Sequence, residues 1–180
     1  MLNQIDILKD VSQRLQTAHI PFMVTGSMAL NYYAQPRMTR DIDIIISLTK
    51  SRIKEIINLF KDDYYISPTA VEESVANRSI FNILHNESII KVDFIIQKQT
   101  TYRQVEFERR QKVSVRDFET FLVSKEDLII SKLIWGKDSR SELQKRDILN
   151  LISTGFDQQY LTSWISKLGL NTYYEEITSG

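Results

Sequence analysis

Apolar and polar residues alternate along several short stretches of the chain, and apolar residues recur at helical spacing along others. The alternation predicts strands at residues 21–25, 41–47, 64–67, 79–84, 88–96, 112–115 and 118–123. The helical spacing predicts helices at about 3–18, 27–33, 51–60, 69–76, 101–110, 125–137, 140–153, 157–168 and 171–177. Strands and helices are therefore mixed up to residue 123, and only helices follow.

This order predicts an α+β fold, in which a mixed β-sheet with flanking helices precedes a C-terminal helical tail. We expect residues 1–123 to form the core domain and residues 124–180 to form a helical region packed on that core. Two tryptophans, Trp135 and Trp164, fall on apolar helix faces and are predicted to be buried. In contrast, His85 falls between two strands and is predicted to be an exposed turn residue.

Composition limits the classes of function. A chain of 180 residues with 42% hydrophobic and 26% charged residues can form a core, so we expect an ordered protein. The absence of cysteine excludes disulfides, zinc–thiolate sites and a cysteine nucleophile. A formal net charge of zero argues against a dedicated non-specific nucleic-acid binder. No signal peptide or membrane-spanning run is apparent, so we expect a cytoplasmic protein without membrane contact.

Two aspartates interrupt the most hydrophobic neighbourhood of the chain. Asp41 and Asp43 alternate with isoleucines, so on a strand both carboxylates leave from the same face. Adjacent carboxylates repel each other and resist desolvation, which indicates a bound cation between them. The alternative is that both lie at a strand end and contact arginines. A third aspartate, Asp93, occupies a similar apolar strand and could lie beside them.

A Gly-Ser pair stands between the first predicted strand and the short helix that follows it. Gly26 allows the backbone to approach a ligand closely, and Ser27 can donate a hydrogen bond from its hydroxyl. The start of a helix offers unpaired N–H groups and the positive end of the helix dipole, which suits phosphate. An anion pocket together with cation-binding carboxylates indicates chemistry on a nucleoside triphosphate.

The stretch GSMALNYYAQPRMTRDIDIII resembles the signature of the DNA polymerase beta-type nucleotidyltransferase superfamily. That signature is a Gly-Ser pair opening a helix, Asp-x-Asp on the next strand, and a third acid on a later strand, here Asp93 in IIKVDFII. The run from Arg37 through Thr39 to Asp43 is similar to that of the small bacterial AbiEii toxin-like branch. The resemblance implies a nucleotidyltransferase-like fold.

The resemblance also implies roles for individual residues. Asp41, Asp43 and Asp93 would be catalytic residues and metal ligands, with Asp93 as the general base or as a ligand to a second ion. Magnesium is the expected ion, with manganese as a substitute, because hard oxygen ligands suit both. Gly26 and Ser27 would bind the β- and γ-phosphates of the nucleotide.

Four residues carry both a functional and a structural interpretation. Lys132 is expected either to reach the triphosphate or to be an ordinary helix lysine. Arg37 and Thr39 are expected either to bind the nucleotide or to fix the loop before the carboxylate strand. Asp147 resembles an acidic position of the family, and we expect it to form an ion pair with Lys132 or Lys145.

These observations predict an enzyme that transfers a nucleoside monophosphate from a triphosphate to a hydroxyl, with release of pyrophosphate. The resemblance permits tRNA, protein or a small hydroxylated antibiotic as acceptor, and a partner protein of the toxin–antitoxin type. The alternative is a non-catalytic nucleotide-binding or antitoxin-like module that keeps the fold without turnover.

Overall fold

The computed structural model describes residues 2–179 and divides the chain into two compact units. The first, called here the sheet unit, consists of Met1–Met28 and Met38–Val123. The second, called the helical unit, consists of Ala29–Arg37 and Ser124–Gly180. The predicted α+β fold is confirmed, whereas the domain boundary at residue 123 stays a prediction.

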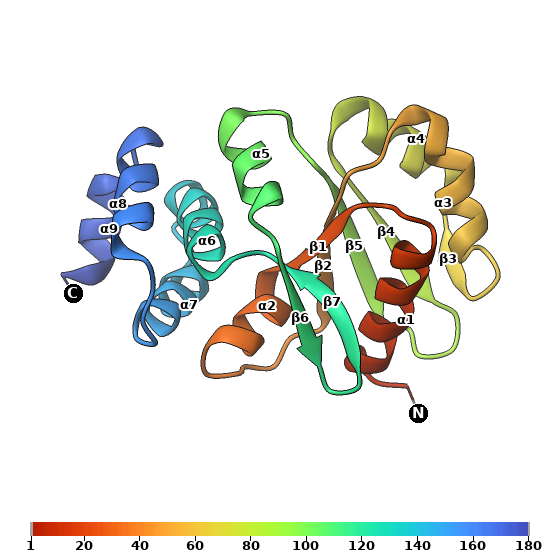
Figure 1. Ribbon diagram of the computed structural model, residues 1–180, viewed down its shortest axis with the longest axis horizontal. Coiled ribbons are helices and arrows are strands. Elements are labelled where there is room, and N and C mark those ends of the chain that lie inside the picture. Colours follow the sequence, from red (N-terminus) through yellow and green to blue (C-terminus); the bar gives the residue numbers. More distant parts are fainter. Residues whose placement is uncertain (1, 180) are drawn as a thin grey trace. The chain divides into compact units, whose positions relative to one another are not determined.

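Seven strands within residues 2–179 form one mixed sheet (Figure 1). They are β1 (Phe22–Thr25), β2 (Asp41–Ile46), β3 (Tyr64–Ile66), β4 (Ile80–His85), β5 (Lys91–Ile96), β6 (Gln111–Val115) and β7 (Phe118–Leu122). Their order in the sheet is β3-β4-β5-β2-β1-β7-β6. The pairs β2–β5 and β1–β7 are parallel, and the remaining pairs are antiparallel.

The helices of the sheet unit agree with the predicted ones in place but differ in how they begin. They are α1 (Gln4–Thr17), a 3-10 turn η1 (Lys50–Arg52), α3 (Ile53–Phe60), α4 (Pro68–Asn77) and α5 (Thr101–Glu108). Ser67 caps α4 by accepting a hydrogen bond from the backbone N–H of Ala70, and Pro68 occupies the first turn. The proline fixes a helical φ without losing a needed donor, so the helix begins earlier than predicted.

One face of the sheet is apolar. Along β2 every second residue is buried, beginning with Ile42, while Asp41 and the residues alternating with it are partly exposed. Helix α3 packs on the apolar face of the central strands through Phe60, whose ring centroid lies 5.6 Å from that of Phe94. Because successive side chains of a strand alternate between faces, the polar side chains of β2 occupy the opposite face.

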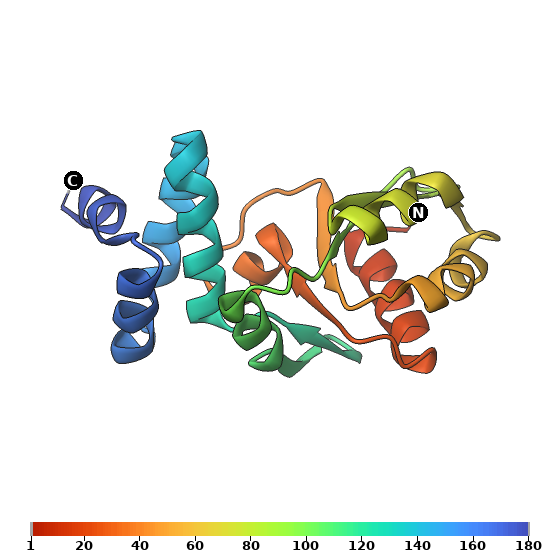
Figure 2. The ribbon, with the colours of Figure 1, turned by 90° about the horizontal axis from the view of Figure 1, so that it is seen from above.

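The helical unit consists of the end of α2 (Gly26–Tyr33), which crosses the boundary between the units, and the C-terminal helices. These are α6 (Lys125–Ser139), α7 (Glu142–Ile152), α8 (Gln158–Lys167) and α9 (Asn171–Thr178). Helices α6 and α7 lie side by side (Figure 2). The buried carboxylate of Asp127 accepts hydrogen bonds from Ser124 at 2.6 Å and from Tyr160 at 2.7 Å, which joins α6 to α8.

Two burial predictions are wrong. Trp135 on α6 is 64% exposed. Because α6 has buried residues around most of its circumference, an apolar residue at one position does not show which side of the helix faces solvent. His85 is buried and accepts a hydrogen bond from the backbone N–H of Ser88, while its ring meets Tyr64 edge-on. None of the helices between residues 2 and 179 combines the length and hydrophobicity required to cross a membrane.

Candidate active site

The three predicted acids of the sheet unit share one face of the sheet. Strands β2 and β5 are parallel neighbours, and their register places Asp43 directly opposite Asp93. Residues that pair across neighbouring strands point to the same side, and Asp41 precedes Asp43 by two residues. All three carboxylates therefore leave from the face opposite the apolar one. Their role as metal ligands stays a prediction.

The row that contains Asp43 and Asp93 extends over four strands. Thr25 of β1 is paired with Asp43, and Asn82 of β4 is paired with Asp93. A row of four polar side chains thus crosses the sheet from β1 to β4. Thr25 and Asn82 were not among the predicted site residues, because strand pairing cannot be read from local alternation. The nearest signal in the sequence is that Thr25 directly precedes Gly26.

Lys91 is a further residue of this face. It stands opposite Asp41, and its ammonium lies 2.8 Å from Asp93 Oδ2 and 3.5 Å from Asp41 Oδ1. The hydrogen bond to Asp93 raises the pKa of the Lys91 ammonium above its ordinary value, against a smaller opposing effect of burial. Lys91 is therefore charged at neutral pH and bridges two of the three acids. Lys91 was not among the predicted site residues.

The turn between β1 and α2 brings the backbone against the carboxylate row. Gly26 has a φ of +61°, a conformation that residues with a Cβ rarely adopt. A Cβ added to Gly26 would lie 2.1 Å from Asp43 Oδ2, so the absence of a side chain is what allows the approach. Ser27 follows in the first turn of α2, where backbone N–H groups and the helix dipole favour an anion.

Thr39 lies at the entrance to β2. Its hydroxyl donates a hydrogen bond to the backbone carbonyl of Asp41 at 3.3 Å. Its own carbonyl accepts one from the side-chain amide of Gln4 at 2.9 Å. Both contacts fix the segment that leads into the carboxylate strand, which agrees with the structural interpretation of Thr39. Its role in nucleotide binding stays a prediction.

The chemistry of the donors on this face fits a hard divalent ion. Carboxylate oxygens are the ligands that magnesium and manganese prefer, and Asp43 and Asp93 stand opposite each other on fixed strands. Among residues 2–179, however, no three His, Asp or Glu side chains are grouped so that they could hold a metal ion together. Two of the expected ligands, Asp41 and Asp93, are engaged by Lys91.

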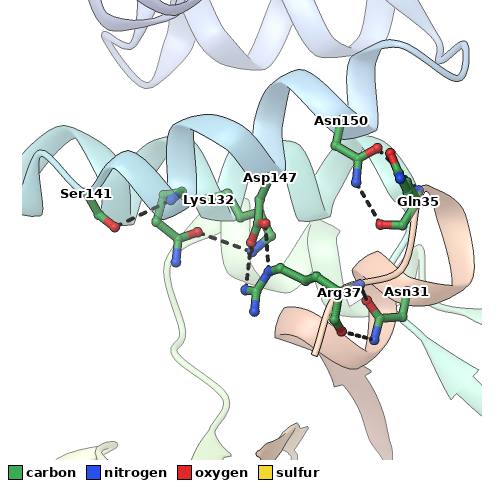
Figure 3. Close-up of polar contacts among 8 residues, drawn as sticks. Asn31, Gln35, Arg37, Lys132, Ser141, Asp147 and Asn150 are labelled. Carbon is green, nitrogen blue, oxygen red and sulfur yellow. Dashed lines mark hydrogen bonds and ion pairs between the residues drawn. The ribbon is translucent and has the colours of Figure 1, made fainter. Parts of the chain in front are cut away.

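In the helical unit, Arg37 and Lys132 bind the same carboxylate (Figure 3). Arg37 donates two hydrogen bonds to Asp147, both at 2.9 Å, in the bidentate geometry that guanidinium and carboxylate groups favour. Lys132 donates to the same carboxylate at 2.8 Å and to Gln144 at 3.2 Å. The predicted ion pair between Asp147 and Lys132 is therefore present, and Arg37 joins it.

This network is buried. The side chains of Lys132 and Asp147 are 6% and 3% exposed, and that of Arg37 is 28% exposed. Burial by itself raises the pKa of Asp147, but hydrogen bonds from Arg37 and then Lys132 outweigh it and hold the pKa below the ordinary value. Further hydrogen bonds fix the segment after α2 (Figure 3). The side-chain amide of Asn31 exchanges two hydrogen bonds with the backbone of Arg37, and the side-chain amide of Asn150 exchanges two with the backbone of Gln35.

The fold and the acidic strand pair together define the class of nucleotidyltransferase-like proteins, and comparison with known proteins agrees. Residues 2–167 match the family model described as "Nucleotidyltransferase of unknown function (DUF6036)". The chain belongs to this family and is thus a transferase whose acceptor the family description leaves open. No curated protein matches the sequence.

Solved structures with the same fold have diverged widely in sequence. The antibiotic-resistance factor ANT(2'')-Ia is 10% identical with a TM-score of 0.60, covering 96% of this chain and 97% of that one. An antigenic nucleotidyltransferase-like protein from Paracoccidioides brasiliensis is 14% identical with a TM-score of 0.58, covering 94% and 89%. The lincomycin-bound lincosamide adenylyltransferase LnuA is 14% identical with a TM-score of 0.56, covering 86% and 99%. At these identities the likeness establishes the fold alone, and the AbiEii-like branch is not confirmed.

Proposed function

We propose that the protein transfers a nucleoside monophosphate from a nucleoside triphosphate to a hydroxyl acceptor in a magnesium-dependent reaction, in which manganese can substitute. The observation that supports this most directly is the placement of Asp43 opposite Asp93, with the backbone of Gly26 against Asp43. Carboxylates on rigid strands beside a helix N-terminus suit a reaction that depends on positioning and on neutralising phosphate charge.

In this reaction the acceptor oxygen attacks the α-phosphorus, and the bond from that phosphorus to the oxygen bridging the β-phosphate breaks. Asp93 takes the proton of the acceptor hydroxyl, and pyrophosphate leaves with the bridging oxygen. Asp41, Asp43 and Asp93 would hold the divalent cations, which would neutralise phosphate charge and lower the pKa of the acceptor hydroxyl. Gly26 and Ser27 bind the β- and γ-phosphates through backbone N–H groups and the serine hydroxyl.

Arg37, Thr39 and Lys132 complete the proposal as nucleotide-binding residues. The contacts described above give each of them a structural partner as well, so activity alone cannot separate the two roles. A residue that binds nucleotide should raise KM for the triphosphate when replaced, with little change in kcat. A residue that only holds the fold should lower the amount of folded enzyme and leave KM unchanged.

For the acceptor, the resemblance of the run from Arg37 to Asp43 to AbiEii-type proteins supports tRNA or protein. Such an activity would place the protein in the bacterial cytoplasm, together with a partner protein of the toxin–antitoxin type. A small hydroxylated antibiotic is the second candidate. It is supported by structural neighbours such as LnuA, bound to lincomycin, and ANT(2'')-Ia, in complex with adenylyl-2''-tobramycin.

A labelling screen tests these proposals. The protein is incubated with each of the four labelled triphosphates and magnesium or manganese. The acceptors are total tRNA, cell extract, a lincosamide and an aminoglycoside. Label on one acceptor class, lost in the Asp43→Asn variant, would establish the activity and its acceptor.

The non-catalytic alternative makes a different prediction for the same protein. Isothermal titration would then detect magnesium-dependent triphosphate binding, while no acceptor became labelled under any condition. Retention of Asp41, Asp43 and Asp93 counts against that outcome, because a module that only binds does not require an acid to accept the proton of a hydroxyl.

A further inference from the structure

Lys91 places a positive charge among the acids of the sheet unit. It stands opposite Asp41 on the neighbouring parallel strand, and Asp93 follows it by two residues on β5. All three side chains therefore leave from the same face. The distances from Lys91 Nζ, 2.8 Å to Asp93 Oδ2 and 3.5 Å to Asp41 Oδ1, make the ammonium a bridge between the two carboxylates.

The bridging ammonium is held by charge more than by burial. The side chains of Lys91 and Asp41 are 40% and 50% exposed, whereas that of Asp93 is 17% exposed. Ion pairs with this exposure are screened by water and contribute little to stability. The flexible four-carbon stem of lysine can carry the ammonium into solvent while the strand stays in place. Displacement of the ammonium therefore requires no change in the fold.

A divalent cation at these carboxylates would need the same oxygen atoms. Hard cations bind carboxylate oxygens at about 2.0–2.6 Å, and Asp93 Oδ2 already accepts a hydrogen bond from Lys91. Two cations close to one carboxylate also repel each other. Binding of the ammonium and binding of the ion must consequently weaken one another.

We propose that Lys91 is a positioning residue that competes with the divalent cation for Asp41 and Asp93. The ammonium offsets the repulsion between the carboxylates until an ion replaces it, and so sets the ion concentration at which the site fills. This inference rests on the proposed metal-dependent function and adds to it a residue that controls how tightly the metal is bound.

Manganese alone is a suitable probe, because its binding can be followed by the electron paramagnetic resonance signal of the free ion without any turnover. Removal of the charge in Lys91→Met, with Lys91→Gln as a second variant, should tighten manganese binding about tenfold, equivalent to about 1.4 kcal/mol. Lys91→Arg keeps the charge and should keep the affinity of the wild type. Circular dichroism establishes that each variant is folded.

The matched control is Lys112→Met. Lys112 pairs with Glu119 between β6 and β7, and the strands β2, β1 and β7 separate β6 from β5. This variant changes the net charge equally and should bind manganese as the wild type does. An equal gain in manganese affinity in Lys112→Met and Lys91→Met would overturn the inference, because the affinity would then depend on net charge alone.

Two further outcomes separate this inference from the proposed function. Equal manganese affinities of the wild type and Lys91→Met would contradict competition between Lys91 and the ion, and would leave the proposed transferase activity unaffected. If neither protein bound manganese or magnesium at millimolar concentration, both the inference and the metal-dependent function would fall. A gain in manganese affinity in Lys91→Met that disappears when Asp93→Asn is added would support competition at the carboxylate of Asp93.

Discussion

Gly26 and Asp43 lie in such close contact that a Cβ on the glycine would stand 2.1 Å from the carboxylate oxygen Oδ2. The two residues belong to different elements, the start of α2 and the strand β2. They are brought together because Thr25, which directly precedes Gly26, pairs with Asp43 in the antiparallel ladder of β1 and β2. The turn that offers backbone N–H groups to an anion thus also packs directly against the carboxylate of Asp43.

Gly26→Ala should therefore destabilise the protein by more than the unfavourable backbone conformation alone would. The positive φ alone destabilises a residue with a Cβ by about 1–2 kcal/mol, and the clash must in addition displace Asp43. We expect a loss of stability above that value in urea unfolding and loss of transferase activity. Gly169→Ala is the matched control, since Gly169 has a φ of +64° with nothing within 4 Å of an added Cβ. Equal losses of stability, with activity retained in both variants, would contradict the close contact.

Asp43→Asn should separate activity from stability. The carboxylates of Asp43 and Asp93 stand opposite each other, and like charges in such pairs are unfavourable, so neutralising one should change the free energy of unfolding by less than about 1 kcal/mol. Transferase activity should fall at least about a hundredfold, because charge stabilisation at the reacting phosphate is lost. Urea unfolding and the labelling assay measure the two effects, and the exposed Asp62→Asn serves as control. Unchanged turnover in Asp43→Asn would remove this residue from the mechanism.

Asp147→Asn should destabilise the fold strongly. The substitution leaves the ammonium of Lys132, whose side chain is 6% exposed, without the carboxylate it binds, and removal of one partner of such a buried pair costs about 3 kcal/mol or more. Chemical denaturation measures the loss. The control is Glu176→Gln, which breaks the exposed pair with Arg140 and should cost less than about 1 kcal/mol. Similar small losses in both variants would show that the buried network contributes no more than a surface pair.

The stability contributed by Asp147 should depend on pH in a defined direction. Because the pKa of Asp147 is lower in the folded protein than in the unfolded chain, its contribution is complete above the ordinary aspartate pKa of about 3.9 and is lost as the pH falls through the lower folded value. The stability difference between wild type and Asp147→Asn should be constant from pH 7 to pH 5 and shrink below about pH 4. Urea unfolding at pH 7, 5, 4 and 3.5 tests this. A difference that already shrank between pH 7 and 5 would require another titrating group.

The sequence by itself determined most of the secondary structure and the sidedness of the carboxylate strand. Alternation of Asp41 and Asp43 with buried isoleucines is a property of local strand geometry, so it could be read without knowing any neighbour. The same holds for Ser124, whose hydroxyl oxygen accepts a hydrogen bond from the backbone N–H of Asp127 at the start of α6. These features depend on contacts within a few residues, where chain geometry leaves few choices.

The tertiary structure decided which strands and side chains pair with one another. The parallel pairing of β2 with β5, which sets Asp43 opposite Asp93 and Lys91 opposite Asp41, joins segments about fifty residues apart. The bidentate pair of Arg37 and Asp147 spans 110 residues. Strand register and such ion pairs follow from the sum of many weak contacts over the whole core, and no short stretch of sequence contains that sum. The sequence could therefore name the acids, but only the fold shows that a lysine lies between two of them.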